Sequence, residues 1–336
     1  MTGRGRATII GTGSYLPEHI LTNKDLEKIV KTNDEWITTR TGIKCRRIAG
    51  AGEETSRMAT QAAVRAMEMA GIGALDLDMI IVGTITAEMV MPSCACLVQK
   101  EIGAENAFAF DVSAACSGFV YAMEIADRYV KNMPNMKILV IGAETLSARV
   151  DWQDRNTCVL FGDGAGACVV TGSKKDEGML SSQLYSDGRL WQLLSLDAAP
   201  RRYCPAVDYG TLPERNSFCD GSAFNMVGKD VFKHAVREMG DAVESLLKRE
   251  GITVHDIDLL IPHQANIRIL KSLSERVNLS FKKVYTTIQK YGNSSAASLP
   301  VALDEANRKG RLQKGDLLLF SVFGGGFTWG VVLWRW

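Results

Sequence analysis

The sequence predicts an α/β fold built from two copies of one structural unit, and two observations predict it. Short continuous apolar runs alternate with amphipathic stretches, a pattern typical of strands that helices bury on both faces. In addition, residues 71–81 (GIGALDLDMII) are similar to residues 251–261 (GITVHDIDLLI), at an offset of 180 positions. We therefore expect two α/β halves, residues 1–180 and 181–336, that pack about a pseudo-twofold axis.

The same offset aligns two further pairs of segments without a gap. Residues 121–128 (YAMEIADR) fall on residues 301–308 (VALDEANR), and the apolar run 137–143 falls on 317–323. One such match could arise by chance. Three matches in a single register indicate a repeated unit.

Each copy is expected to contain a helix, a buried strand, a loop, a second strand, a second helix and a third strand. In the first copy, helices are predicted at about 56–70 and at 117–130. Its strands are predicted at 78–84, 107–112 and 136–143, and those of the second copy at 258–266, 284–290 and 317–323.

Composition excludes several classes of function. The chain has 336 residues, 46% of them hydrophobic and 23% charged, which is typical of a globular protein with a large core. The net charge of +1 gives no overall attraction to nucleic acid or to membranes. No apolar run has the length of a membrane span, and the first residues lack a secretory signal. We therefore expect a cytoplasmic protein in which any basic site is a local patch.

The cysteines and glycines do not indicate a metal or a nucleotide cofactor. Eight cysteines are present, and those at 158 and 168 lie in apolar runs, which favours reduced thiols. Cys94 and Cys96 lack the spacing of paired metal ligands, and the four histidines are scattered. Residues 161–167 (FGDGAGA) are predicted to join two strands, a context that does not fit a dinucleotide-binding turn.

Cys116 lies in DVSAACSGF (111–119), where a predicted strand runs into a predicted helix. The small neighbours and the sharp turn are typical of an exposed nucleophile. The start of a helix favours the thiolate, so we expect the pKa of Cys116 to fall below about 8.5. A buried structural cysteine is the better hypothesis for any single cysteine. Partner residues must decide between the two.

The second copy supplies two such partners. His263 ends the predicted strand 258–266, and Asn293 stands before a helix start in YGNSSAAS (291–298). Alone, each fits a structural role or a helix cap. The repeat, however, places Asn293 on the turn equivalent to that of Cys116, and His263 at the end of another repeated strand. A Cys–His–Asn site is therefore the favoured interpretation.

Three consecutive glycines follow the last repeated strand, in SVFGGGFTWG (321–330). Such a loop can present backbone N–H groups to an oxyanion. It also fits a tight hairpin turn between the apolar runs 317–323 and 329–334. Both interpretations can hold together.

Six motifs closely resemble the β-ketoacyl-acyl-carrier-protein synthase III family, the condensing enzymes that initiate bacterial type II fatty-acid synthesis. In chain order they are DEWITTRTGI, DVSAACSGF, DRNTCVLFGDGAGA, PHQANIRI, YGNSSAAS and FGGGFTWG. The resemblance covers essentially the whole chain. It implies the thiolase fold, in which two duplicated halves form five α-β-α-β-α layers, and it implies a homodimer.

The resemblance also implies a reaction and roles for the site residues. Cys116 would take an acyl group from acyl-coenzyme A, and malonyl-acyl-carrier protein would then lose carbon dioxide and attack that group. His263 and Asn293 would donate hydrogen bonds to the malonyl thioester oxygen, and the backbone N–H groups of Cys116 and Gly325 would form a second oxyanion hole. Coenzyme A and the carrier protein belong to the substrates, so no cofactor is implied.

The resemblance assigns further residues to substrate binding. Thr32, Trp36, Arg40 and Arg155 map to coenzyme A recognition, where an indole and a guanidinium can hold adenine between them. Asn266 matches a position that contacts pantetheine. Without the resemblance, core packing for Trp36 and surface charge for the arginines would be the better interpretations.

A basic patch is the feature expected to bind the acidic carrier protein. Lys229, Lys233 and Arg237 are spaced by four residues on one predicted helix, and Arg268 and Lys271 follow His263 one helical turn apart from each other. The resemblance assigns Lys233 and Arg268 to carrier docking, and Arg237 lies beside them. A solvated helix face is the alternative.

One departure from the family concerns the acyl pocket. The family often has phenylalanine before Pro92, where it reaches into the partner subunit's acyl pocket, whereas this chain has Met91. Because methionine is flexible, we expect longer or branched primers to be accepted as well as acetyl. The stretch 186–222 is expected to cover that pocket as loop and short helices.

The alternatives are two other kinds of enzyme and a non-catalytic protein. A plant-type polyketide, quinolone-forming or starter-unit condensing enzyme is the enzymatic alternative. A thiolase would be expected to have a second active-site cysteine in the C-terminal glycine loop, and no cysteine follows Cys219. A non-catalytic carrier-binding scaffold would be expected to have lost the Cys–His–Asn set.

Overall fold

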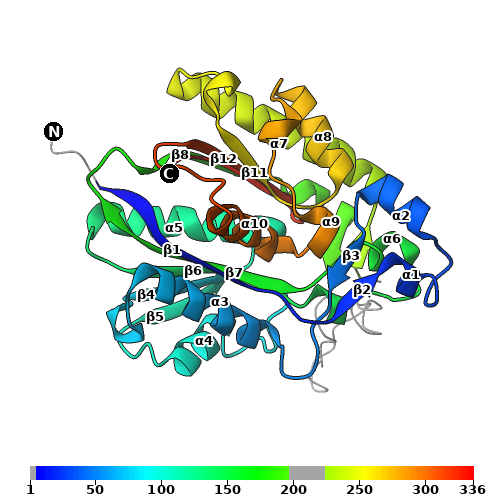
Figure 1. Cartoon of the computed structure of the whole chain (residues 1–336), viewed down its shortest axis with the longest axis horizontal. Helices are drawn as coiled ribbons and strands as arrows, with labels where there is room; N and C mark the ends of the chain where they lie inside the picture. The colour runs from blue at the N-terminus through cyan, green and yellow to red at the C-terminus, as the bar shows by residue number, and fades with distance from the viewer. Residues whose placement is uncertain (1–4, 197–223) are drawn as a thin grey trace, which may run out of the picture.

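A computed structural model describes residues 5–196 and 224–336, which form two β-sheets separated and covered by helices (Figure 1). The first sheet has five strands in the order β1-β7-β6-β4-β5, and the second has four in the order β11-β12-β13-β8. The first comprises β1 (Arg6–Tyr15), β4 (Met79–Gly83), β5 (Phe108–Val112), β6 (Ile138–Glu144) and β7 (Gly164–Ser173). The second comprises β8 (Gly178–Ser186), β11 (Leu259–Pro262), β12 (Leu317–Gly324) and β13 (Thr328–Arg335).

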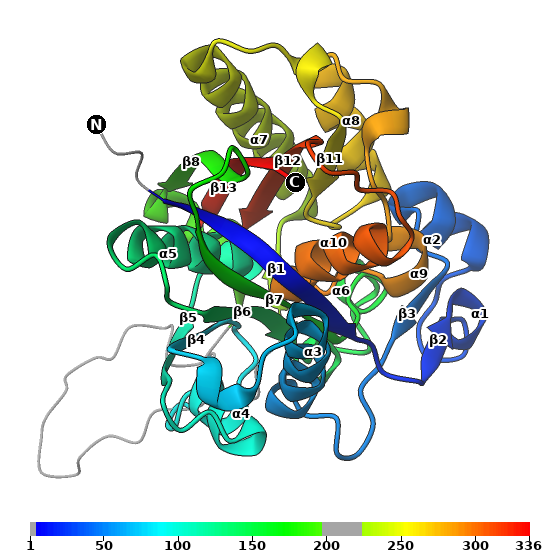
Figure 2. The same ribbon diagram turned by 60° about the vertical axis from the view of Figure 1, so that its left-hand side comes forward.

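The helices form three layers, so the molecule has the five layers that the family resemblance implied (Figure 2). Helices α3 (Thr55–Ala70) and α4 (Cys94–Ile102) cover the outer face of the first sheet. Helices α5 (Gly118–Asn132) and α10 (Ser298–Arg308) lie between the sheets. Helices α7 (Gly228–Glu250) and α8 (Ile267–Arg276) cover the outer face of the second sheet.

Alternation along the strands explains why both sheets are buried on two faces. In β6, Ile138 and Val140 pack toward the central helices, whereas Leu139 and Ile141 pack toward α3 and α4. Successive side chains of a strand point to opposite faces, so a continuous apolar run suits a sheet covered on both sides. The apolar runs that predicted these strands are therefore explained by their position.

Smaller elements sit at the end of the layers where the site lies. They are β2 (Ile20–Thr22), β3 (Cys45–Arg47), α1 (Asn23–Leu26), α2 (Asp34–Thr41), α6 (Arg155–Cys158), α9 (Ile288–Tyr291), β9 (Leu194–Leu196) and β10 (Phe224–Met226). Arg46 of β3 is fully buried among them, and its guanidinium donates to the carbonyls of Leu21 and Val159 at 3.2 and 2.7 Å. These bonds tie α6 to the small sheet of β2 and β3.

The repeat predicted from sequence extends to individual hydrogen bonds. Asp78 accepts a bond from the backbone N–H of Lys137 at 2.8 Å, and Asp258, 180 positions later, accepts one from Leu317 at 2.8 Å. Ala115 and Ser295, again 180 positions apart, both adopt a left-handed backbone, with φ of 46° and 48°. The predicted boundary at residue 180 falls inside β8, and the division into domains there stays a prediction.

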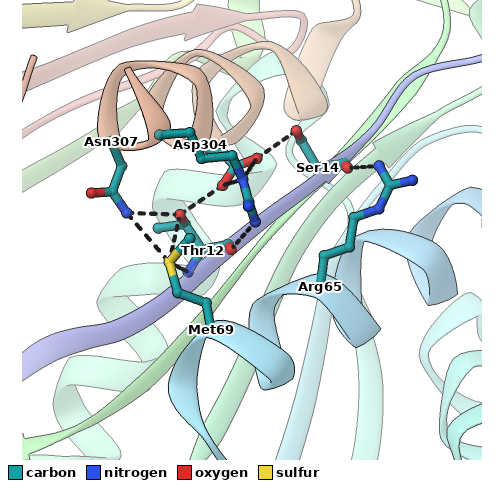
Figure 3. A network of polar contacts seen from close by, with 7 residues as sticks. Thr12, Ser14, Arg65, Met69, Asp304 and Asn307 are labelled. Atoms are coloured by element: carbon teal, nitrogen blue, oxygen red, sulfur yellow. Dashed lines mark hydrogen bonds and ion pairs between the residues drawn. The ribbon is translucent and has the colours of Figure 1, made fainter. Parts of the chain in front are cut away.

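A polar network joins the central helix α10 to the first sheet and to α3 (Figure 3). Asp304 is almost completely buried and accepts hydrogen bonds from the hydroxyls of Thr12 and Ser14 at 2.7 and 2.6 Å. Arg308 pairs with the same carboxylate at 2.9 Å. Because each buried polar atom has a partner, the network fixes the position of α10 against β1 without leaving an unpaired charge.

Two predicted strands are wrong. Residues 284–290 contain only an isolated bridge from Val284 to Leu260, followed by α9. The side-chain oxygen of buried Gln264 accepts hydrogen bonds from the backbone N–H groups of Thr287 and Ile288 at 2.8 and 3.2 Å. These bonds start a helical turn instead of a strand.

The predicted strand–turn–strand around 161–167 is also wrong. The segment before it forms α6, because Asp154 caps a helical turn by accepting from the backbone of Asn156 at 2.9 Å. The strand β7 begins at Gly164, inside the predicted turn. Of the stretch 186–222, Ser186 ends β8, residues 188–193 form a short 3-10 helix and 194–196 form β9; residues 197–222 lie outside the described residues.

Candidate active site

One large cavity, of about 1280 Å³, opens where the two halves meet. Cys116, His263, Asn293 and Gly325 all line it, so the structure brings together the residues predicted from four separate motifs. They come from the turn after β5, the ends of β11 and β12, and the segment before α10. The repeat accounts for this convergence, because equivalent ends of the two sheets face the same space.

Cys116 lies in a short 3-10 turn, Ala115–Ser117, between β5 and α5. Cys116 is partly exposed and lines the cavity. Burial raises the pKa of Cys116 to about 12, while the nearby Ser295 hydroxyl lowers it only in part. The expected lowering of this pKa by the helix is therefore wrong for the protein without substrate.

The glycine loop closes against the Cys116 turn as a hairpin between β12 and β13, as predicted. A Cβ atom on Gly324 would lie 2.7 Å from the backbone nitrogen of Cys116, so no larger residue fits there. Thr328 donates from its hydroxyl to the carbonyl of Ala114 at 2.9 Å, which fastens the loop to the turn. Among the described residues, the N–H groups of Cys116 and Gly325 bond to no other backbone carbonyl.

His263 follows β11 and is held as a neutral imidazole. Burial lowers its pKa to about 3, and no acidic group offsets that effect. Its Nδ1 lies 2.7 Å from the Ser298 hydroxyl, whose oxygen also accepts the backbone N–H of Gln264 at 3.2 Å.

The first copy of the repeated unit has no equivalent of the His263–Ser298 pair. Gly83 and Gly118 stand 180 positions before His263 and Ser298. A Cβ on Gly83 would lie 2.5 Å from the carbonyl carbon of Gly118, so side chains are excluded at that place.

Asn293 is fixed through its backbone and its side-chain oxygen. Its N–H donates to the carbonyl of Leu160 at 2.9 Å, and its own carbonyl accepts from Gly162 at 3.0 Å. The side-chain Oδ1 accepts the backbone N–H of Ser295 at 2.9 Å. The amide NH₂ is therefore the part of Asn293 left to donate into the cavity.

The residues expected to bind coenzyme A lie at and beyond the rim of the cavity. Arg40 and Asn266 line it, whereas Thr32, Trp36 and Arg155 do not. The guanidinium carbons of Arg155 and Arg40 lie 4.5 and 5.4 Å from the centre of the Trp36 ring. Asn266 also caps α8, because its Oδ1 accepts the backbone N–H of Arg268 at 2.8 Å. The buried hydroxyl of Thr32 has no hydrogen-bond partner in the described part of the chain.

The predicted basic patch is exposed on α7 and α8, which pack together. Lys229, Lys233, Arg237, Arg268 and Lys271 are all exposed. Lys229 and Arg268 also line the cavity, so the patch continues to its opening. Arg237 is engaged by Glu238 at 2.5 Å, which leaves it less available than Lys233 to an external partner.

Met91 projects from the protein instead of lining this cavity. It is 85% exposed and Val90 is fully exposed, which is unusual for side chains of this size. Val90 lines the cavity together with Glu88 and Met89, and Met91 follows it before α4.

Two polar residues beside Cys116 were missed from the sequence. Glu144 ends β6 and is fully buried, and burial raises its pKa to about 7. Ser295 lies in the turn before α10 and is 1% exposed. The offset of 180 positions was the available signal, because it pairs Ser295 with Ala115, the residue before the nucleophile.

Some classes of site are absent from the described ranges. No three His, Cys, Asp or Glu side chains there are grouped as a metal site would require. No described helix is long and apolar enough to cross a membrane. The six described cysteines are free thiols, while Cys204 and Cys219 lie outside the described residues.

Comparison with known proteins gives consistent matches. The sequence profile described as 3-oxoacyl-(acyl-carrier-protein) synthase III matches residues 110–188, and that of its C-terminal part matches residues 247–336. The β-ketoacyl-acyl-carrier-protein synthase III of Desulfotalea psychrophila is 56% identical over 98% of this chain and 99% of its own length.

Solved structures agree with these sequence matches. The crystal structure of 3-oxoacyl-(acyl-carrier-protein) synthase III from Aquifex aeolicus is 48% identical, with a TM-score of 0.90, over 99% of this chain and all of that one. A priming β-ketosynthase from a polyketide biosynthetic pathway is 33% identical, with a TM-score of 0.89, over 100% of this chain and 98% of that one.

Proposed function

Because this chain belongs to the β-ketoacyl-acyl-carrier-protein synthase III family, we propose that Cys116, His263 and Asn293 perform its condensation reaction. The chain is an acyltransferase of the thiolase fold that catalyses the initiating condensation of fatty-acid synthesis. Acyl-coenzyme A and acyl-carrier protein are its substrates. The observation that carries the assignment of residues is their convergence on one cavity from both repeats.

In the first half-reaction, the sulfur of Cys116 attacks the thioester carbonyl of the acyl-coenzyme A primer. The carbon–sulfur bond to coenzyme A breaks, which leaves an acyl group on Cys116 and releases coenzyme A. The negative oxygen of the tetrahedral intermediate would accept from the backbone N–H groups of Cys116 and Gly325, which have no backbone partner in the described structure. Donors fixed in this way stabilise charge that develops only in the transition state.

In the second half-reaction, malonyl-acyl-carrier protein loses carbon dioxide, and negative charge develops on its thioester oxygen. A neutral His263 suits this step if its Nε2 carries the proton. The Ser298 hydroxyl accepts from Gln264, so its own proton is placed to donate to His263 Nδ1. The Nε2–H and the NH₂ of Asn293 then both donate to the enolate oxygen, and the enolate carbon attacks the acyl group on Cys116.

Substrate binding follows the positions of the aromatic and basic residues. We assign the adenine of coenzyme A to Trp36 and Arg155, which would have to separate from their 4.5 Å contact to admit a ring between them. Arg40, Asn266 and Thr32 would contact the rest of that substrate. Lys233 and Arg268, with Arg237 at the side, would bind the acidic carrier protein beside the opening.

A homodimer is the proposed assembly. Strand β5 is an edge of the first sheet, and its Phe108 is 46% exposed. An exposed apolar edge strand with free backbone groups favours pairing with a second copy. The exposed Val90 and Met91 would then reach the partner subunit, where Met91 would contribute to an acyl pocket. A cytoplasmic location is proposed with it.

The polyketide or starter-unit alternative is disfavoured by the comparisons. The synthase III relatives from Desulfotalea psychrophila and Aquifex aeolicus, at 56% and 48% identity, are more similar in sequence than the priming β-ketosynthase at 33%. An assay of the second substrate separates the two functions, because fatty-acid initiation requires malonyl-acyl-carrier protein and polyketide enzymes of the plant type use malonyl-coenzyme A.

The test of the proposed function follows each half-reaction separately. Radiolabelled acetyl-coenzyme A should label the wild-type protein and fail to label Cys116→Ala. Condensation should proceed with malonyl-acyl-carrier protein, and a series of acetyl, butyryl and branched primers should show acceptance beyond acetyl. Labelling of Cys116→Ala equal to that of the wild type would refute the role of Cys116, and acceptance of acetyl alone would refute the role of Met91.

A further inference from the structure

Glu144 lies behind the Cys116 turn and has no role in the steps above. Its Oε2 accepts hydrogen bonds from the Thr84 hydroxyl, the Ile85 backbone and the Thr86 hydroxyl, at 3.3, 3.2 and 2.5 Å. These three donors fix the carboxyl group in one orientation. Its other oxygen, Oε1, is buried and has no hydrogen-bond partner among the described residues.

Ser295 begins the turn Ser295–Ala297, which packs against both β6, where Glu144 lies, and the Ala115–Ser117 turn that holds Cys116. Its hydroxyl is also buried without a hydrogen-bond partner in the described structure. In keeping with this position, the Ser295 hydroxyl lowers the pKa of both Cys116 and Glu144. The left-handed backbone of Ser295, with φ of 48°, is unfavourable for a residue other than glycine. Backbone strain of this kind is concentrated at functional sites.

We propose that Glu144 accepts the thiol proton of Cys116 through the Ser295 hydroxyl during acyl transfer. As the sulfur attacks the thioester, its proton passes to Ser295 Oγ, and the Ser295 proton passes to Glu144 Oε1. When coenzyme A leaves as a thiolate, the same route returns the proton to it. The carboxylate is restored, and the net products are the acyl-cysteine and coenzyme A thiol. This proposal rests on the proposed role of Cys116.

The electrostatics of the site support this assignment of the proton. The pKa of Cys116 is raised to about 12, so the thiol is protonated before substrate binds. Burial lowers the pKa of His263 to about 3, which makes it a poor acceptor. Glu144 has a pKa near 7, the range suited to proton transfer at neutral pH. The other ionisable groups on this side are Cys94, Glu88 and Asp111.

The test measures acylation of Cys116 by acetyl-coenzyme A in single turnovers between pH 5.5 and 8.5. We expect the wild-type rate to rise with pH through an inflection near 7. Glu144→Gln keeps the size of the side chain but cannot accept the proton, so we expect a rate about 10²-fold lower with no inflection. Ser295→Ala should give the same result, and its backbone bond to Asn293 remains.

Two controls separate the relay from a structural effect. Decarboxylation of malonyl-acyl-carrier protein depends on His263 and Asn293, so both variants should change it far less than they change acylation. Asp163→Asn alters another buried carboxyl group, one that accepts from the backbone of Ala49 and Ser147, and it should keep the inflection.

The outcomes also distinguish this relay from the proposed function. An inflection that persists in Glu144→Gln, or an equal loss of both half-reactions in Ser295→Ala, would overturn the relay. Absence of acyl transfer in the wild type would overturn the role of Cys116 and leave no proton transfer to explain.

Discussion

The side chain of Ser298 determines which nitrogen of His263 faces the cavity. The ring is buried and uncharged, so its hydrogen bond at Nδ1 selects the tautomer. With the Ser298 proton directed to Nδ1, the remaining proton resides on Nε2, where it can donate to an enolate. The Ser298 hydroxyl, at the start of α10, thus selects the tautomer of a histidine that follows β11.

Replacing Ser298 with alanine should therefore impair condensation more than acyl transfer. We expect a roughly tenfold loss of the decarboxylation rate and a loss of about 1–2 kcal/mol in the free energy of unfolding. Ser274→Ala is the matched control, because Ser274 is equally buried and bonds only to a helix carbonyl. Single-turnover assays and chemical unfolding measure both effects. Equal loss of the two half-reactions would contradict the tautomer argument.

Some residues of the site could be predicted from the sequence, and others could not, for identifiable reasons. Cys116 and His263 follow strands, and the offset of 180 positions places Asn293 on the turn equivalent to that of Cys116, although the segment before Asn293 forms α9 instead of the predicted strand. Glu144 also ends a strand, but its carboxyl group is significant only because the fold buries it beside Ser295. The pKa of Cys116 was predicted in the wrong direction, since sequence shows the helix start but not the exclusion of water.

Among the elements, the hairpin of β12 and β13 sets the space available to the nucleophile. Gly324 is the point of closest approach, where an added Cβ would lie 2.7 Å from the Cys116 nitrogen and 3.2 Å from its Cβ. The neighbours are backbone atoms, which have little freedom to move. The requirement for glycine at this position is therefore steric.

Gly324→Ala should displace the hairpin from the Cys116 turn. We expect a loss of about 1–3 kcal/mol in stability, typical of overpacking, together with a large loss of acyl transfer. Gly73→Ala is the control, since its Cβ would meet only a carboxylate oxygen at 3.6 Å. Thermal unfolding and labelling with acetyl-coenzyme A provide the measurements. Normal labelling of Gly324→Ala would show that the contact is not required.

Helices α7 and α8 together carry the proposed docking surface. Reversing Lys233 and Arg268 to glutamate should raise the apparent Michaelis constant for malonyl-acyl-carrier protein by about tenfold, because charges at the edge of an interface act mainly on association. Acyl transfer from acetyl-coenzyme A should change little. Lys248→Glu, near the far end of α7, is the control for a charge change on the same helix. A Michaelis constant unchanged by the double reversal would exclude this surface.

The two wrong strands show where element prediction from sequence fails. The run 284–290 has the composition of a strand, yet a side chain from elsewhere, Gln264, bonds to its backbone and bends it into α9. The run 157–161 is apolar, but its first turn is capped by Asp154. In both cases one side chain that bonds to the backbone outweighs the apolar pattern.

For the whole molecule, buried His263 and Glu144 have opposite effects on how the free energy of unfolding depends on pH. Folding lowers the pKa of His263 from 6.5 to about 3, so the unfolded chain binds an extra proton below pH 6.5 and stability falls as the pH falls. Folding raises the pKa of Glu144 from 4.5 to about 7, so stability falls as the pH rises from 4.5 to 7. Between pH 4.5 and 6.5 the two slopes have opposite signs.

Substituting His263 or Glu144 should therefore change the slope of the free energy of unfolding against pH in opposite directions. His263→Gln removes the contribution of His263, so relative to the wild type the free energy of unfolding should decline with rising pH by up to about 1.4 kcal/mol per unit. Glu144→Gln removes the contribution of Glu144, so relative to the wild type the free energy of unfolding should decline with falling pH. Urea unfolding at pH 4.5, 5.5 and 6.5 measures both slopes relative to the wild type. Equal slopes for the two variants would contradict the opposite contributions of His263 and Glu144.

The fold contains two copies of one unit, but the His263–Ser298 pair is present in the second copy alone. Gly83 and Gly118 occupy the places of His263 and Ser298 in the first copy, and they pack too closely for any side chain to enter. A second reaction centre related by the pseudo-twofold axis is therefore sterically excluded. The stoichiometry follows directly: active-site titration should count one acyl group for each chain, and a dimer should carry two.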